Sequence, residues 1–85
     1  MERTWYVYIL RCADQTLYTG VTTDLARRVR EHNERVEGAK YTRARRPVSL
    51  VFSESFPNRS EACIREAAIK KLSRKEKEAL MHLSP

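Results

Sequence analysis

The sequence predicts a small α+β domain, in which a three-stranded antiparallel sheet is flanked by helices in the order β-β-α-β-α-α. Apolar residues that alternate with period two indicate three strands, and capping residues ahead of charged stretches indicate three helices. No repeat, low-complexity tract or linker divides the chain. We therefore expect one domain over residues 1–85, with room for one core and one site.

The first two strands are expected to form a hairpin. Thr4 to Cys12 carries apolar β-formers on both faces, which is typical of a central strand covered on both sides. Residues 13–16 form a polar break of hairpin length, and Leu17 to Val21 returns as the antiparallel partner. Tyr8 and Tyr18 then lie on neighbouring strands, and the pairing register decides whether they share a face.

A basic helix follows, for which Thr22, Thr23 and Asp24 are acceptable N-caps and Gly38 is the expected end. After a basic run at residues 40–46, alternation from Val48 to Phe56 predicts the third strand.

Two capping patterns predict the last two helices. Asn58 with Glu61 opens a helix that is expected to reach Leu72, and Ser73 with Glu76 opens a final helix through Leu83.

The charge balance favours an anionic partner. The formal net charge is +6, which favours nucleic acid first and an anionic membrane surface second. The longest apolar run, Trp5 to Leu10, is far too short to span a bilayer, and no helical stretch pairs a broad apolar face with a basic one. No signal peptide is visible, so we expect a cytoplasmic or nucleoid-associated protein without a membrane partner.

Cys12 and Cys63 are the only cysteines. Two isolated thiols without a signal peptide indicate a reducing compartment, and core positions are expected for both. A zinc site built from them with His32 and His82 would lack any ligand-pair spacing, so zinc is not expected.

The stretch from Leu17 to His32 gathers the side chains of a candidate site. It holds a phenol (Tyr18), a flexible backbone point (Gly20), a guanidinium (Arg28) and the imidazole of His32. Arg28 and His32 are four residues apart and share a helix face. Each has a structural alternative: a core tyrosine, an arginine on a solvated face, and a histidine near a helix C-terminus.

Glu66 is the one carboxylate without an evident structural task. At about 100° per residue, it lies between Ala62 and Cys63 on the small apolar face of its helix. A carboxylate directed toward the protein is rare unless it is paired or binds a metal. The structural alternative is a salt bridge to an arginine or extension to the rim of the core.

Taken together, these residues resemble the GIY-YIG nuclease superfamily. The resemblance rests, in chain order, on Tyr6-Val7-Tyr8, on Tyr18-Thr19-Gly20, and then on Arg28, His32 and Glu66. It covers nearly the whole chain and is closest to the small stand-alone bacterial GIY-YIG proteins and to the nuclease domain of the Slx-type structure-specific endonucleases. Tyr6 stands where the first family motif has glycine, and Val21 where the excision-repair nucleases have lysine.

The resemblance implies a three-stranded antiparallel sheet flanked by helices, and phosphodiester hydrolysis with one divalent metal, Mg²⁺ or Mn²⁺. The residues that it implies as catalytic are Tyr8, Tyr18, Arg28, His32 and Glu66, with Glu66 as the metal ligand. Tyr18 would orient or deprotonate the attacking water, Tyr8 would hydrogen-bond in the same site, and His32 would be the alternative base or a proton relay. We therefore expect Tyr18, Arg28 and Glu66 to converge on one cleft, with Tyr8 at its floor.

The leading hypothesis is a metal-dependent endonuclease that acts on DNA, branched or flapped, in repair, recombination or processing, with RNA not excluded. The residues expected to bind nucleic acid are Arg27, Arg30, Lys40, Tyr41, Arg43, Arg45 and Arg46. One alternative is a nucleic-acid-binding module of the same fold with little or no activity. Another is a basic domain that binds a protein or RNA partner, and a protein partner could also supply specificity to the nuclease.

Overall fold

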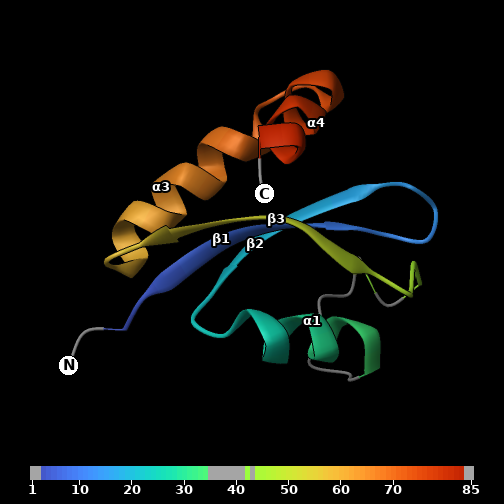
Figure 1. The fold of residues 1–85 in the computed structure, drawn as a ribbon, viewed down its shortest axis with the longest axis horizontal. Helices are drawn as coiled ribbons and strands as arrows, with labels where there is room; N and C mark the ends of the chain where they lie inside the picture. The colour runs from blue at the N-terminus through green and yellow to red at the C-terminus, as the bar shows by residue number, and fades with distance from the viewer. Residues whose placement is uncertain (1–2, 35–41, 43, 84–85) are drawn as a thin grey trace.

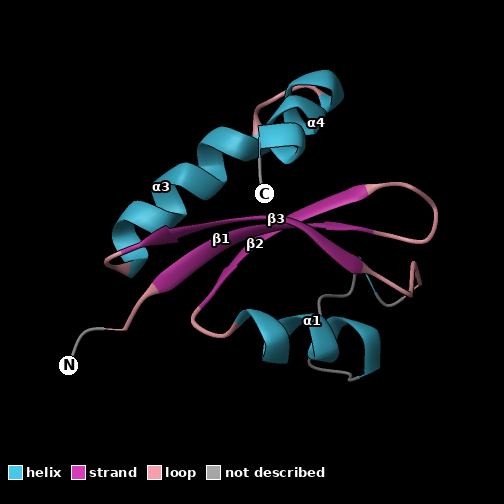
Figure 2. Ribbon diagram, in the orientation of Figure 1, coloured by secondary structure: helices cyan, strands magenta, loops and turns pink. Residues whose placement is uncertain are grey.

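The computed structural model of the chain describes residues 3–34, 42 and 44–83. Three strands form one antiparallel sheet in the order β2-β1-β3. Helix α1 lies on one side of this sheet, and α3 and α4 lie on the other (Figure 1; Figure 2 shows the same view by secondary structure). The elements are β1 (Trp5–Arg11), β2 (Leu17–Thr22), α1 (Leu25–Glu34), β3 (Ser49–Phe56), α3 (Arg59–Lys70) and α4 (Arg74–Leu83). The predicted fold class and element order are confirmed.

Strand β1 is the central strand because both of its faces are apolar. Its four inner residues, 7–10, are each at most 1% exposed. Val7 and Ile9 pack with Phe52 and with two residues of α3, Ala62 and Ile69. On the other side, the cluster with α1 consists of Tyr8, Leu10, Cys12 and Val48, with Tyr18, Leu25 and Val29 packed against it.

The hairpin register resolves the question that the sequence left open about the two tyrosines. Tyr8 pairs with Gly20, and Leu10 pairs with Tyr18. Because alternate residues of a strand share a face, both tyrosines point toward α1. The turn between the strands places Gln15 in the left-handed region, with φ of 71°.

Local hydrogen bonds start the helices where the cap residues predicted. The Asn58 side chain accepts from the Glu61 backbone N–H at 2.9 Å and donates to its carboxylate at 3.0 Å. Ser73 and Glu76 form a reciprocal capping box, with bonds of 3.2 and 3.0 Å. At the start of α1, Asp24 is the candidate that caps the helix, because its carboxylate accepts a backbone N–H bond at 3.0 Å.

The two cysteines differ in burial. Cys12 is buried, as expected, whereas Cys63 is only half-buried and the prediction of a core position for it is wrong. Cys63 lines a shallow depression on the outer side of α3, next to the exposed Ile64.

Gly38, the expected end of the first helix, lies outside the described residues. No helix in the described part of the chain is both long and apolar enough to cross a membrane.

Candidate active site

Four of the predicted site residues come together on the face of the sheet that α1 covers. The Tyr8 hydroxyl lies 3.0 Å from Nε2 of His32. The ring centroid of Tyr18 is 6.4 Å from that of Tyr8 and 5.1 Å from that of His32. Arg28, one helical turn before His32, hydrogen-bonds the Tyr8 hydroxyl. The hairpin register and the i, i+4 spacing on α1 together produce this cluster.

Gly20 makes room for the Tyr8 phenol. A Cβ atom at Gly20 would lie 2.5 Å from the Tyr8 hydroxyl oxygen and 2.7 Å from the ring carbon that bears it. Such distances are well inside van der Waals contact, so the phenol can cross β2 at this point only because the residue has no side chain. Gly20, the last residue of Tyr18-Thr19-Gly20, therefore has a steric function.

His32 is fully buried and bonded at both ring nitrogens. Its Nδ1 lies 2.7 Å from the hydroxyl of Thr42, which is also fully buried. Burial, together with the positive charges of Arg28 and Arg46, lowers the pKa of His32 to about 4. The imidazole is therefore neutral at neutral pH.

The donor and acceptor roles in this cluster follow from Arg28, which can only donate. The Tyr8 hydroxyl accepts from Arg28, so its own proton is directed to Nε2 of His32. A neutral His32 that accepts at Nε2 carries its proton on Nδ1, from which it donates to Thr42. The result is one directed chain from the guanidinium, through phenol and imidazole, to the Thr42 hydroxyl.

Thr42 is the site residue that sequence reasoning missed. It lies within the basic run at residues 40–46, where no apolar alternation marks any position as buried. Its neighbour in space is His32, ten residues earlier in the chain. A threonine in a run of arginines gives no sequence signal for such a contact.

The two tyrosines differ in exposure and therefore in the chemistry open to them. Tyr8 is 1% exposed, and its burial, with the nearby Tyr18 and Glu66, raises its pKa to about 12 despite the opposing effect of Arg28. Its phenol therefore keeps its proton at neutral pH. Tyr18 is half-buried and is the tyrosine of the pair with access to solvent.

Arg28 is held between the sheet and its own helix. Its side chain is 26% exposed and donates to the Glu31 carboxylate at 3.0 Å. Partial burial alone would lower the pKa of Arg28, but the hydrogen bonds to Tyr8 and Glu31 outweigh it and raise that pKa. The guanidinium therefore has a fixed position next to the phenol.

Glu66 stands on α3, on the opposite side of the sheet from α1 (Figure 1). Its side chain is 22% exposed and pairs with Lys70 at 3.3 Å, so the ion-pair partner is a lysine of the same helix. Its negative charge nevertheless acts on the Tyr8 phenol, whose pKa it helps to raise. The four residues of the α1 face therefore lie together, whereas Glu66 stands on the other side of the sheet and is linked to them only through its charge, so the expected convergence of Tyr18, Arg28 and Glu66 on one cleft stays a prediction.

A divalent metal at this site would rest on Glu66 as its protein ligand. Among residues 3–34, 42 and 44–83, no three His, Cys, Asp or Glu side chains are grouped as metal ligands. Mg²⁺ is commonly bound through one or two carboxylates, with waters and substrate phosphates completing its shell. A single half-buried carboxylate fits this open mode of binding and does not fit a closed, all-protein site.

The described arginines that were predicted to bind nucleic acid fall into two groups. Arg27 and Arg30 are exposed on α1. Arg45 and Arg46 are half-buried and attach their loop to the domain, since Arg45 pairs with Asp14 at 3.1 Å and Arg46 donates to the backbone carbonyl of residue 32. The other three residues of the prediction, Lys40, Tyr41 and Arg43, lie outside the described residues.

Comparison with known proteins gives consistent matches along the chain. Residues 4–79 match the family model of the GIY-YIG catalytic domain. A UPF0213 protein of Desulfotalea psychrophila is 58% identical over 80 residues, which cover 94% of this chain and 73% of the relative. A UPF0213 protein of Halobacterium salinarum is 59% identical over 75 residues, covering 88% and 96%.

Solved structures agree with these matches. The solution NMR structure of a UPF0213 protein from Bacillus halodurans is similar with a TM-score of 0.60 and 49% identity, covering 94% of this chain and 84% of that one. The solution NMR structure of a protein from E. faecalis gives a TM-score of 0.64 at 46% identity, covering 100% and 95%. GIY-YIG domains are nuclease domains that generally depend on a divalent metal. The chain therefore belongs to the GIY-YIG family, within the UPF0213 group of small stand-alone domains.

Proposed function

We propose that the protein is a divalent-metal-dependent endonuclease that hydrolyses phosphodiester bonds of DNA and selects branched or flapped structures rather than sequences. The observation that carries this proposal is the contact cluster of two tyrosines, one arginine and one histidine, on whose central phenol the charge of Glu66 acts. The family supports nuclease-type activity. Repair, recombination or other DNA processing in the cytoplasm is the setting that we assign to it.

Tyr18 is the group that we assign to the attacking water. It is half-buried, whereas His32 is fully buried and uses both ring nitrogens in hydrogen bonds. A base must come within hydrogen-bond reach of the water that it activates. This requirement favours Tyr18 over His32 as the base, and it leaves Tyr8 and His32 to hold the site in position and to relay protons.

Arg28 is assigned to the phosphate. A guanidinium offers planar, bidentate recognition of phosphate oxygens and stabilises the charge that grows on them in the transition state. Its bonds to Tyr8 and Glu31 fix its plane before substrate arrives, so little reorganisation is needed.

Glu66 is assigned to the metal. A divalent cation there would supply Lewis-acid neutralisation of the phosphoryl oxygens and of the leaving oxygen. Lys70 pairs with this carboxylate at 3.3 Å, and a cation that uses the same oxygen would displace it. The exposed basic residues Arg27 and Arg30, with the run at residues 40–46, would contact flanking phosphates.

The direct test is cleavage of labelled flapped, branched and linear DNA by the purified protein, with Mg²⁺, with Mn²⁺ and with chelator. We expect metal-dependent cleavage of the branched or flapped substrates, and its loss in Glu66→Gln. Glu78→Gln is the matched control, because Glu78 is an exposed carboxylate of α4 with its own cation, Arg74. Absence of cleavage by the wild type would remove the nuclease assignment, and equal cleavage by Glu66→Gln would remove the assignment of the metal to Glu66.

A second candidate is a nucleic-acid-binding module with weak or no activity. The Glu66–Lys70 ion pair favours it, because a carboxylate with a resident cation binds a metal less readily. Tight, salt-dependent DNA binding without cleavage at any metal concentration would establish this candidate. Cleavage that increases in Lys70→Gln would show instead that the ion pair only tunes metal affinity.

A further inference from the structure

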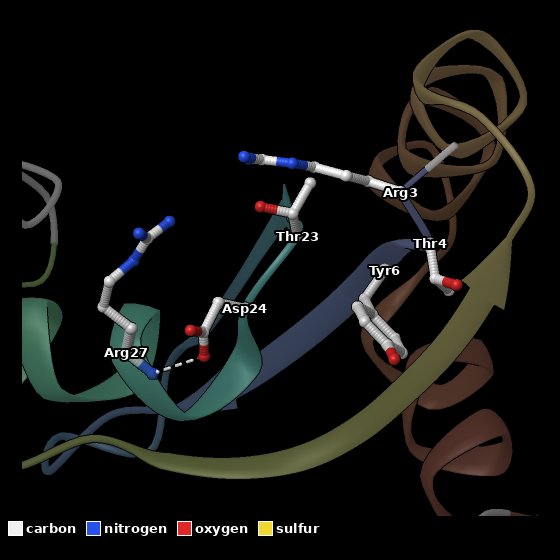
Figure 3. A pocket seen from close by; sticks show the side chains of 6 residues that line it. All are labelled: Arg3, Thr4, Tyr6, Thr23, Asp24 and Arg27. Carbon is white, nitrogen blue, oxygen red and sulfur yellow. Dashed lines mark hydrogen bonds between the residues drawn. The ribbon is translucent and has the colours of Figure 1, made fainter. Parts of the chain in front are cut away.

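A basic cavity of about 390 Å³ lies at the start of α1 (Figure 3). Three segments contribute to it: the residues ahead of β1, the first half of β1, and the β2–α1 connection with the first turn of α1. The guanidinium groups of Arg3 and Arg27 extend toward the same opening, and Thr23 lies beside the Arg3 side chain (Figure 3). The lining residues are Arg3, Thr4, Tyr6, Thr23, Asp24 and Arg27.

The charge of this cavity matches a singly charged anion. Arg3 and Arg27 supply two positive charges, and Asp24 supplies one negative charge. One oxygen of Asp24 is already used to cap α1, so the helix N-terminus itself is satisfied. Glu31 lies 3.8 Å from Arg27 but does not line the cavity, so its charge is not counted here. The remaining charge of about +1 suits a phosphodiester better than a doubly charged phosphate.

The cavity adjoins the candidate active site along two elements. Tyr6 precedes Tyr8 by two residues on the same face of β1, which is roughly 7 Å along the strand. Arg27 directly precedes Arg28 on α1. A step of this size is comparable to the separation of successive phosphates along a polynucleotide. A strand whose scissile phosphate contacts Arg28 would therefore bring a neighbouring phosphate to the cavity.

We propose that the cavity formed by Arg3, Thr23 and Arg27 binds the backbone phosphodiester next to the one that is cleaved. The arginines hold the phosphate oxygens, the Thr23 hydroxyl is placed to donate to them, and the Tyr6 ring forms a wall on the side of β1. This proposal rests on the proposed function, from which it takes its DNA substrate. The role of the cavity, as a phosphate subsite, is to set the register of the strand, so that the scissile linkage lies at Arg28.

The first test measures binding without cleavage, so that it does not depend on activity. Affinity for a fluorescent branched oligonucleotide is measured by anisotropy in chelator over a range of salt concentrations. Arg3→Gln and Arg27→Gln should each weaken binding and reduce the slope of log Kd against log salt by roughly 0.7 to 0.9. Arg74→Gln, which removes the same charge from an exposed site on α4, should leave the slope unchanged.

The second test locates the phosphate. A single neutral methylphosphonate is moved one linkage at a time along the strand. For the wild type, we expect one linkage next to the cleaved one at which this change weakens binding several-fold. In the Arg3→Gln/Arg27→Gln double variant the same linkage should show no further loss, because the charge that recognised it is gone.

The outcomes separate this proposal from the proposed function. If Arg3→Gln and Arg27→Gln behave like Arg74→Gln, or if the double variant remains sensitive at every linkage, the subsite is wrong even where the wild type cleaves DNA. If the subsite results hold while Glu66→Gln cleaves like the wild type, the metal assignment is wrong and the subsite stands. A wild type that binds no oligonucleotide overturns both.

Discussion

The two faces of the central strand bury different kinds of side chain. Toward α3 and α4, β1 presents Val7 and Ile9 to an apolar cluster. Toward α1, it presents Tyr8, whose surroundings include the fully buried polar side chains of His32 and Thr42. One face therefore supplies stability through apolar burial, and the other holds a hydrogen-bonded polar site. Period-two alternation lets a single strand serve both, because successive side chains point to opposite faces.

The largest effect on stability is expected from the apolar face. Ile69 of α3 is fully buried, so Ile69→Ala should lower the free energy of unfolding by about 2–5 kcal/mol, measured by urea denaturation. Ile64→Ala is the matched control, because Ile64 is 70% exposed on the same helix and its loss should cost no more than about 0.5 kcal/mol. Similar losses in the two variants would contradict the assignment of the core to this face.

The polar face should make stability depend on pH between 4 and 6.5. The pKa of His32 is about 4 in the folded protein and near its ordinary value of 6.5 when unfolded. The unfolded state therefore binds more protons in this range, and the contribution is complete above pH 6.5 and is lost as pH falls toward 4. We expect a loss of roughly 3 kcal/mol from this residue.

The measurement is urea unfolding at a series of pH values for the wild type, for His32→Gln and for His82→Gln. Subtracting the His32→Gln curve from the wild-type curve should leave the component between pH 4 and 6.5, whereas His82→Gln, at an exposed position of α4, should run parallel to the wild type. A wild type that runs parallel to His32→Gln would contradict the buried, neutral imidazole.

A smaller effect is expected at Thr42. Thr42→Val keeps the shape of the side chain but removes the acceptor for the Nδ1 proton of His32, which should cost about 1–3 kcal/mol of stability. The ¹⁵N shifts of the imidazole should also move from the Nδ1–H tautomer toward the Nε2–H tautomer. Thr42→Ser should restore both, and an Nε2–H tautomer in the wild type would reverse the direction that we assign to the chain.

Local patterns in the sequence predict most of the fold. Alternation along residues 4–12 identifies the central strand, and the pairs Asn58–Glu61 and Ser73–Glu76 place the starts of two helices correctly. These features succeed because each depends on residues a few positions apart. The prediction for Cys63 fails because residue type alone does not determine which side of α3 faces the sheet.

The site is harder to predict because it depends on contacts between distant segments. The residues were available from the sequence. The shared face of the two tyrosines, however, depends on the hairpin register, and the Thr42–His32 bond joins two residues that are ten positions apart in the chain. The steric role of Gly20 likewise becomes visible only when Tyr8 is seen to cross it. The lysine partner of Glu66, four residues later on its helix, was within reach of sequence reasoning.

The central claim is that the face of the sheet toward α1 is the site of chemistry. Removal of the hydroxyl oxygen of Tyr18 tests this claim most directly, because Tyr18 is the solvent-accessible phenol of that face. Single-turnover cleavage and chelator-based binding are measured for the wild type and Tyr18→Phe on the substrate that the wild type cuts best. We predict a cleavage rate at least about 100-fold lower with affinity nearly unchanged, since a positioned base contributes on this scale. Full cleavage by Tyr18→Phe would contradict the assignment of the α1 face as the site of chemistry.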